Sequence, residues 1–118
     1  QNLLVIKAEL IISQNIELDK IKARFLDLLK AAFPLVKINR KLDQWFLLKT
    51  SDFLSEFAKQ KFKLSLAKQS EWIAYFESER AKANVMQDHI KKTDREIDAL
   101  VYELYGLTEE EIRIVEGS

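Results

Sequence analysis

The segment LAKQSEWIAYFESERAKANVMQDHIKKTDREIDALVYELY, residues 66–105, contains neither glycine nor proline. Apolar side chains recur along it every seven residues, with further ones three residues later, as in the seam of a coiled coil. The seam positions are Phe76, Ala83, Met86, Ile90, Ile97, Leu100 and Leu104. We predict a single helix over about residues 66–105, about 60 Å long at the usual rise per residue, which must bury its seam against a partner helix.

Residues 2–33 carry a second pattern of the same kind, and the stripe is wide enough to need more than one neighbour. Its seven-residue repeat runs through Leu4, Ile11, Leu18 and Phe25. Pro34 ends the predicted helix because proline disfavours helical geometry in the residue before it. We expect this helix to pack antiparallel on the helix of residues 66–105. Another chain or a parent domain is the alternative partner.

Two short helices are predicted between the long ones. The first, over about residues 37–45, follows from apolar residues spaced by four and then three, namely Ile38, Leu42 and Trp45. The second, over about residues 52–60, is preceded by the tripeptide Thr50-Ser51-Asp52. Each member of that tripeptide is a favourable N-cap residue.

The C-terminal end reads as a helix, a turn and a capped short helix. Gly106 stands where a helix terminates in a left-handed residue, which glycine adopts without steric cost. Leu107 can then fold back on the last helical turn. Thr108 and Glu111 have the spacing of a capping box, which predicts a final helix over residues 109–115.

These elements define an all-α fold: a long antiparallel, coiled-coil-like helical hairpin, short helices at one end and a short capped C-terminal helix. Residues 1–118 are expected to form one helical domain, and the initial Gln1 points to a piece of a larger protein. Two glycines, one proline and no cysteine argue against a sandwich or barrel, a disulfide framework and a thiolate metal site. The absence of cysteine and of a secretory signal indicates a cytoplasmic location. No apolar run approaches the ~20 residues that a membrane span requires.

The formal net charge of zero hides a separation of charge along the chain. Residues 37–68 contain eight basic and three acidic side chains, whereas residues 94–118 contain two basic and eight acidic ones. The basic segment supplies the candidate contacts to DNA phosphates, which are Lys37, Arg40, Lys41, Lys59, Lys61 and Lys63. A solvated surface that balances the acidic tail is the favoured alternative to direct DNA contact.

No catalytic, cofactor-binding or metal-binding residue is expected in this chain. His89 is the only histidine, and the sequence lacks an HExxH pair, a phosphate-cradling glycine loop and a nucleophile elbow. Asp94 and Asp98 share one helical face, where a solvated surface is the simpler interpretation than a carboxylate dyad. The aromatic residues are expected to pack at helix crossings rather than to stack on bases.

The segment KTDREIDALVYELYGLTEEEIRIVEG, residues 92–117, resembles the C-terminal end of bacterial restriction–modification enzymes. It is most similar to type II, single-chain (IIG-like) adenine-specific DNA methyltransferases that combine cleavage with methylation. Related endings also occur near helical regions of type I specificity subunits. Residues 42–77 resemble the region that precedes this ending, so the resemblance covers about two-thirds of the chain.

The resemblance implies a parent enzyme that transfers a methyl group from S-adenosylmethionine to adenine N6 in DNA, with or without an endonuclease domain. The methyl-transfer tetrapeptide of that family, N/D-P-P-Y/F, is absent, and so is its cofactor-binding glycine motif. No catalytic residue can therefore be assigned here, and no cofactor is expected in this chain. The implied role is a non-catalytic scaffold that braces the target-recognition part or docks subunits. Its partners would be the rest of the parent enzyme, partner subunits and, through the parent, DNA, with no membrane.

An alternative of a different class is a stand-alone coiled-coil module for protein–protein interaction. Such a module would form a homodimer through the helical seam of residues 76–104. An enzyme in its own right is the least supported interpretation, since no reactive group is placed beside a base, a metal ligand or a phosphate loop.

Overall fold

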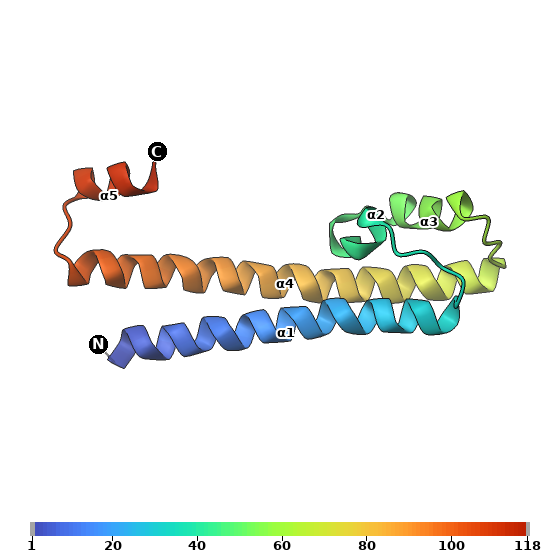
Figure 1. Ribbon diagram of the computed structural model, residues 1–118, viewed down its shortest axis with the longest axis horizontal. Helices are drawn as coiled ribbons and strands as arrows, with labels where there is room; N and C mark the ends of the chain where they lie inside the picture. The colour runs from blue at the N-terminus through green and yellow to red at the C-terminus, as the bar shows by residue number, and fades with distance from the viewer. Residues whose placement is uncertain (1, 118) are drawn as a thin grey trace. The chain divides into compact units, whose positions relative to one another are not determined.

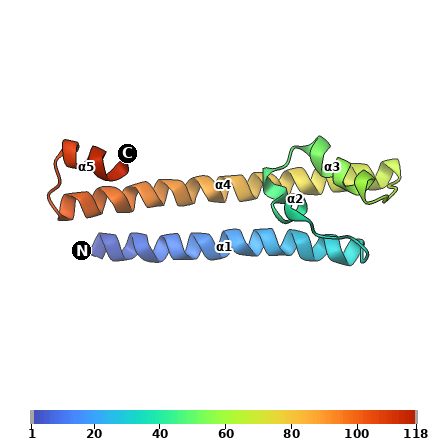
Figure 2. The same ribbon diagram turned by 45° about the horizontal axis from the view of Figure 1, so that its top comes forward.

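The computed structural model describes residues 2–117, and over that range it contains helices and no strand. Figures 1 and 2 show the order of the elements along the chain. They are α1 (Asn2–Ala32), α2 (Arg40–Asp43), a 3-10 turn η1 (Trp45–Leu47), α3 (Thr50–Lys59), α4 (Leu66–Leu104) and α5 (Glu109–Glu116). The all-α prediction is confirmed, and α1 packs against α4 as the predicted antiparallel hairpin requires.

The ends of the long helices lie where the sequence places them, whereas the short helices differ from the prediction. Only Arg40–Asp43 of residues 37–45 is α-helical, because Asn39 is extended and caps it through a hydrogen bond from the Leu42 amide at 2.9 Å. Helix α3 begins at Thr50, so its N-cap is Lys49, which contributes no side-chain cap. The predicted capping role of Thr50-Ser51-Asp52 is therefore wrong; the Thr50 hydroxyl instead donates to Glu77 at 2.7 Å.

Contacts divide the chain into two compact units rather than one evenly packed domain. The central unit is Glu17–Met86, and the terminal unit comprises the chain up to Ile16 and from Gln87 onward. Helices α1 and α4 each contribute one half to each unit. Each unit is therefore a helix pair with additional elements, and each is described separately.

The central unit has an aromatic core. Phe25 stacks on Trp45, with ring centroids 4.0 Å apart, and Phe53 stacks on Phe76 at 4.3 Å. All four rings are fully buried. Burial of each such side chain contributes about 1.5–3 kcal/mol, and each well-oriented aromatic pair adds about 0.5–1.5 kcal/mol. This cluster joins α1, η1, α3 and α4 into a three-layered core.

The terminal unit is held by lighter contacts. The seam residues Ile90, Ile97 and Leu100 of α4 are half-buried. The Lys7 ammonium of α1 forms an ion pair with Glu96 of α4 at 3.2 Å. Thr93 is the one fully buried residue of this unit within the described chain, and its hydroxyl donates to the backbone carbonyl of His89 at 3.0 Å.

The predicted C-terminal turn is confirmed. Gly106 has a φ of +64°, and the amides of Gly106 and Leu107 donate to the carbonyls of Glu103 and Tyr102, as in a Schellman motif. Thr108 and Glu111 form both hydrogen bonds of the capping box, at 3.2 and 3.0 Å. Among the helices of residues 2–117, none combines the length and apolarity that crossing a membrane requires.

Candidate functional site

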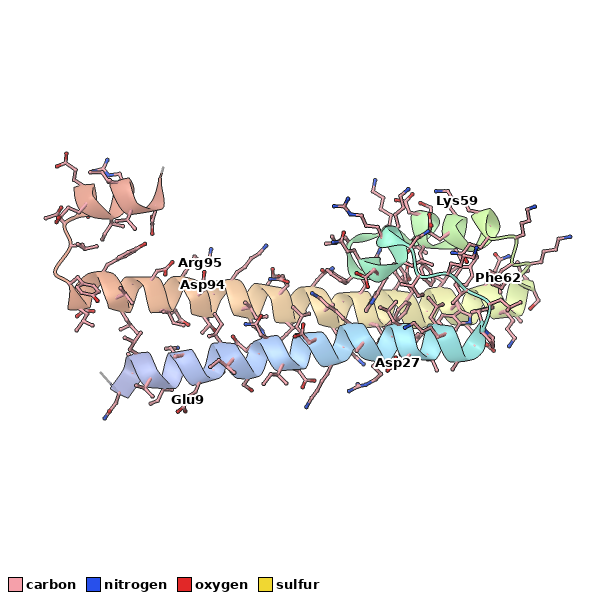
Figure 3. All side chains as sticks on the ribbon, viewed as in Figure 1. Glu9, Asp27, Lys59, Phe62, Asp94 and Arg95 are labelled. Carbon is pink, nitrogen blue, oxygen red and sulfur yellow. The ribbon has the colours of Figure 1, made fainter. Side chains whose placement is uncertain are left out.

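The described chain offers no cluster of ligands or reactive groups. Within residues 2–117, no three His, Asp or Glu side chains gather as a metal site would need. His89 is exposed on α4, and so are Asp94 and Arg95 (Figure 3). The surfaces with distinctive chemistry are a basic hollow in the central unit and an exposed apolar surface in the terminal unit.

The basic hollow has a volume of about 400 Å³ and is lined by Leu35, Lys37, Lys59, Gln60 and Lys61. It lies where the connector after α1 meets the C-terminal end of α3. Three of its five lining residues are lysines, and all three are exposed. Figure 3 shows the Lys59 side chain on α3. The structure thus brings together three of the lysines that the sequence nominated as phosphate contacts.

Two hydrogen bonds fix the backbone on the two sides of the hollow. The Lys37 amide donates to the Gln60 side-chain oxygen at 2.9 Å. The Gln60 side-chain nitrogen donates to the Lys37 carbonyl at 2.8 Å. This reciprocal pair ties the connector to the C-cap of α3, so the Cα positions of Lys37 and Lys61 are held in a fixed relation.

A buried carboxylate lies beneath the basic side chains. Glu56 is only 2% exposed, and it accepts hydrogen bonds from Asn39 at 2.8 Å and from Lys59 at 3.1 Å. Burial raises the pKa of Glu56. The hydrogen bonds from Asn39 and Lys59 and the nearby charges of Lys59 and Lys41 together lower it by more, so the net pKa lies below its ordinary value. Lys41 therefore belongs to the same group of charges as Lys59.

Lys61 has an unusual backbone conformation. Its φ is +64°, the left-handed region that L-residues with side chains rarely adopt. The Lys61 and Phe62 amides donate to Ala58 and Phe57, so α3 ends in a Schellman motif with lysine at the position that glycine normally takes. A side chain at this position costs about 1–2 kcal/mol relative to glycine.

The other two predicted phosphate contacts lie apart from the hollow. Arg40 is exposed at the first residue of α2, and Lys63 is exposed in the connector between α3 and α4. No hydrogen bond or ion pair of their side chains occurs in the described part of the chain. The hollow therefore brings together Lys37, Lys59 and Lys61, whereas Lys41, Arg40 and Lys63 are not part of its lining.

The separation of charge seen in the sequence coincides with the two units. The central unit carries 14 basic and nine acidic side chains, a formal charge of +5. The terminal unit carries five basic and ten acidic side chains, a formal charge of −5. A polyanion is therefore attracted by the first unit and repelled by the second.

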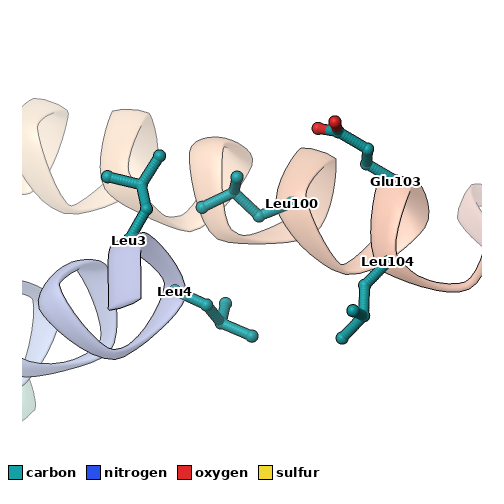
Figure 4. A pocket seen from close by; sticks show the side chains of 5 residues that line it. All are labelled: Leu3, Leu4, Leu100, Glu103 and Leu104. Carbon is teal, nitrogen blue, oxygen red and sulfur yellow. The ribbon is translucent and has the colours of Figure 1, made fainter. Parts of the chain in front are cut away.

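The terminal unit exposes much of its apolar surface. We use the term apolar flank for the exposed aliphatic residues of α1 in this unit: Leu3, Val5, Ile6, Leu10, Ile12 and Ile16. Their exposed fractions run from 40% to 59%. A hollow of about 480 Å³ adjoins them, lined by Leu3, Leu4, Leu100, Glu103 and Leu104 (Figure 4). A helix that is apolar on more than one side is normally covered on more than one side.

The predicted helix-pairing seam is used inside the chain. Phe76 and Ala83 are buried in the central unit, and Met86 is half-buried there. In the terminal unit, Leu104 remains 52% exposed. Helix α4 packs against α1, and the apolar surface that stays open in the terminal unit belongs mainly to α1.

Sequence reasoning missed three residues that shape the basic hollow, namely Asn39, Glu56 and Gln60. Asn39 could have been found, because asparagine directly before the short segment RKLD is a good N-cap. Glu56 and Gln60 gave no comparable signal, since a glutamate and a glutamine on a short amphipathic helix are usually exposed.

A protein-family model described as "Domain of unknown function (DUF8810)" matches residues 1–101. The chain belongs to this family. The DUF8810 match includes α1, α2, η1, α3 and most of α4, whereas Gly106 and α5 lie beyond it. No curated protein and no solved structure matches the chain. The description of the DUF8810 family names no activity, so the resemblance to restriction–modification enzymes stays a prediction.

Proposed function

We propose that this chain is a non-catalytic helical brace of a DNA restriction–modification enzyme, in which it supports the target-recognition part or docks subunits. The parent activity would be transfer of a methyl group from S-adenosylmethionine to adenine N6, with or without DNA cleavage, in the cytoplasm. The observation that carries the bracing role is the apolar flank of the terminal unit. The resemblance of residues 92–117 supplies the class of parent enzyme.

The energetics of the apolar flank support a docking role. Full burial of a Leu, Ile or Val side chain contributes about 1.5–3 kcal/mol, and the six residues of the flank are each about half exposed. Covering them would release about 5 kcal/mol or more before the costs of association. A surface of this kind is typical of a protein–protein contact.

The charge of the terminal unit indicates the kind of partner. With a formal charge of −5, this unit repels nucleic acid and anionic lipid headgroups. A protein surface is the remaining macromolecular partner that covers aliphatic side chains. The rest of the parent enzyme or a partner subunit fits that requirement.

Methyl transfer by the whole gene product that contains this chain tests the proposal. Duplex DNA is incubated with labelled S-adenosylmethionine, and adenine N6 methylation is measured for the natural protein and for Ile12→Glu. Ile12 is 59% exposed, so the charge should disturb docking while the isolated chain keeps its helical circular dichroism. Ala31→Glu, on an exposed position of α1 in the central unit, is the matched control.

Methylation by the natural protein, retained by Ala31→Glu and lowered at least tenfold by Ile12→Glu, supports the proposal. The proposal is wrong if the gene product neither contains nor associates with a subunit bearing an N/D-P-P-Y/F tetrapeptide and transfers no methyl group.

The second candidate function is a stand-alone interaction module that self-associates. It is favoured by the apolar flank alone, since a second copy could cover that surface while the seam of α4 stays paired with α1. Sedimentation equilibrium of the isolated chain at increasing concentration distinguishes the two. A monomer at every concentration removes the self-associating module, whereas a dimer that Ile12→Glu dissociates supports it.

A further inference from the structure

We infer that the basic hollow of the central unit binds the phosphodiester backbone of duplex DNA without reading its sequence. Lys37, Lys59 and Lys61 would supply the positive charge. The inference deepens the proposed function and rests on it for the choice of DNA as the polyanion. A brace that carried this site would hold the enzyme on its substrate as well as support its shape.

The positive charge of the hollow is largely unneutralised. In the part of the chain that the structure describes, neither Lys37 nor Lys61 has a carboxylate oxygen within 4.0 Å of its ammonium. Lys59 shares its charge with Glu56, and the Asp52 carboxylate also acts on Lys59. Two free ammonium groups and one shared one remain to face an incoming anion.

The backbone of the hollow is preorganised for binding. The reciprocal hydrogen bonds between Gln60 and the Lys37 backbone hold the two walls of the hollow together. Glu56 fixes α2 against α3 through Asn39. Binding therefore orders side chains but not the backbone, which lowers the entropic cost of recognising a phosphate chain.

The backbone of Lys61 is strained at the edge of the hollow. Its left-handed φ of +64° would be free of strain for glycine, which occupies the equivalent position at the end of α4. Strain of this type is characteristic of functional positions. What lysine contributes here, and glycine would not, is an ammonium group at the edge of the hollow.

The lining favours a phosphodiester chain over an acidic peptide. Leu35 is the one apolar side chain among the five lining residues, whereas a protein interface needs an apolar centre. Contacts to DNA phosphates need lysines and backbone or amide groups, which this hollow has. The formal charge of +5 on the central unit also attracts a polyanion.

Fluorescence anisotropy with a labelled duplex of arbitrary sequence tests the inference. The isolated chain is titrated into the duplex between 50 and 200 mM salt. With three phosphate contacts, a plot of the logarithm of the affinity against the logarithm of the salt concentration should have a slope of about −2.7, which is a loss of about 40-fold over this range. A second duplex of unrelated sequence should bind equally well.

The variant pair separates the hollow from general charge. Lys37→Gln with Lys61→Gln should weaken binding at least tenfold and reduce the slope by about two. Lys91→Gln with Lys92→Gln removes the same charge from exposed positions of α4 in the terminal unit, and it should leave binding within about twofold of the natural chain.

Lys61→Gly distinguishes binding from folding. Relief of the left-handed strain should raise the melting temperature by roughly 4 °C, while the loss of one phosphate contact should weaken DNA binding several-fold. A variant that becomes more stable and binds less well supports the inference in a way that misfolding cannot imitate.

Three outcomes would overturn the inference. They are an absence of binding at 50 mM salt, equal losses in the hollow and control pairs, and equally tight binding of a polyglutamate peptide with the same dependence on Lys37 and Lys61. The last outcome would make the hollow a docking site for an acidic protein segment. None of these outcomes affects the methyl-transfer assay, so the proposed function is tested independently of this inference.

Discussion

The central and terminal units use the same two helices and reach different degrees of packing. Of the 14 buried residues in the described chain, 13 belong to the central unit and only Thr93 belongs to the terminal one. In the central unit, η1 and α3 place Trp45, Phe53 and Phe57 over the helix pair. The corresponding addition in the terminal unit, α5, buries no residue of its own. The pair of helices α1 and α4 does not bury a core by itself; the core forms where η1 and α3 pack on the pair.

This difference has a functional meaning. The central unit buries its own apolar core, so it can serve as a rigid platform, and its distinctive exposed surface is the basic hollow. The terminal unit leaves the aliphatic residues of the apolar flank exposed, and an exposed surface of this kind is typically buried by a binding partner. The basic hollow and the apolar flank thus assign different kinds of partner to the two halves of the hairpin.

The largest expected effect is from Phe25→Ala, which removes the centre of the aromatic core. Phe25 contacts Trp45, Phe53, Tyr75 and Phe76, so the free energy of unfolding should fall by about 3–5 kcal/mol. Guanidinium denaturation followed by circular dichroism measures it. Ile12→Ala, in the apolar flank, should cost less than about 1 kcal/mol. Similar losses for the two variants would show that the units are equally well packed.

Acid should weaken the central unit through Glu56. Because the pKa of Glu56 is lower in the folded chain than its ordinary value near 4.5, its contribution to stability is complete above that value. The contribution is lost as the pH falls towards the lower, folded-state pKa. Melting temperatures between pH 6 and pH 3 should therefore decline more steeply for the natural chain than for Glu56→Gln. If the melting temperatures of the two proteins fall equally with pH, Glu56 does not contribute to the loss of stability in acid.

Gln14→Leu should stabilise the terminal unit. The Gln14 side-chain oxygen is buried and has no hydrogen-bond partner in the part of the chain that the structure describes. An unsatisfied buried polar atom costs about 1–3 kcal/mol, and leucine would continue the apolar stripe of α1. We expect a gain of about 1 kcal/mol in thermal or chemical denaturation. A loss would mean that the amide finds a partner in solution.

The long helices were predictable because their signals are local. Pro34 and Gly106 mark ends, and the seven-residue repeats fix which faces are apolar. The capping box of Thr108 and Glu111 was equally readable, since both hydrogen bonds lie within four residues of sequence.

The remaining features depend on tertiary contacts that no local pattern encodes. The hydroxyl of Thr50 bonds to Glu77 rather than capping α3, because α4 brings that carboxylate within reach. The turn at Lys61 lacks the glycine that normally marks a left-handed helix end. Glu56 is buried beside Asn39, the N-cap residue of α2, and beside Lys59 of its own helix, a tertiary arrangement that no local pattern predicts. The sequence nominated six basic residues, but only the fold places Lys37, Lys59 and Lys61 around one hollow and leaves the other three outside it.

Both tryptophans of the chain, Trp45 and Trp72, belong to the central unit, and the terminal unit has only Tyr102 and Tyr105 as aromatic chromophores of the phenol or indole type. Indole emission therefore monitors one half of the molecule, while the amide signal in the far ultraviolet monitors both. If the less densely packed half melts first, the two optical probes will give separate midpoints, and a single two-state fit will not describe the chain. The placement of two indole rings thus provides a built-in spectroscopic label for cooperativity between the halves.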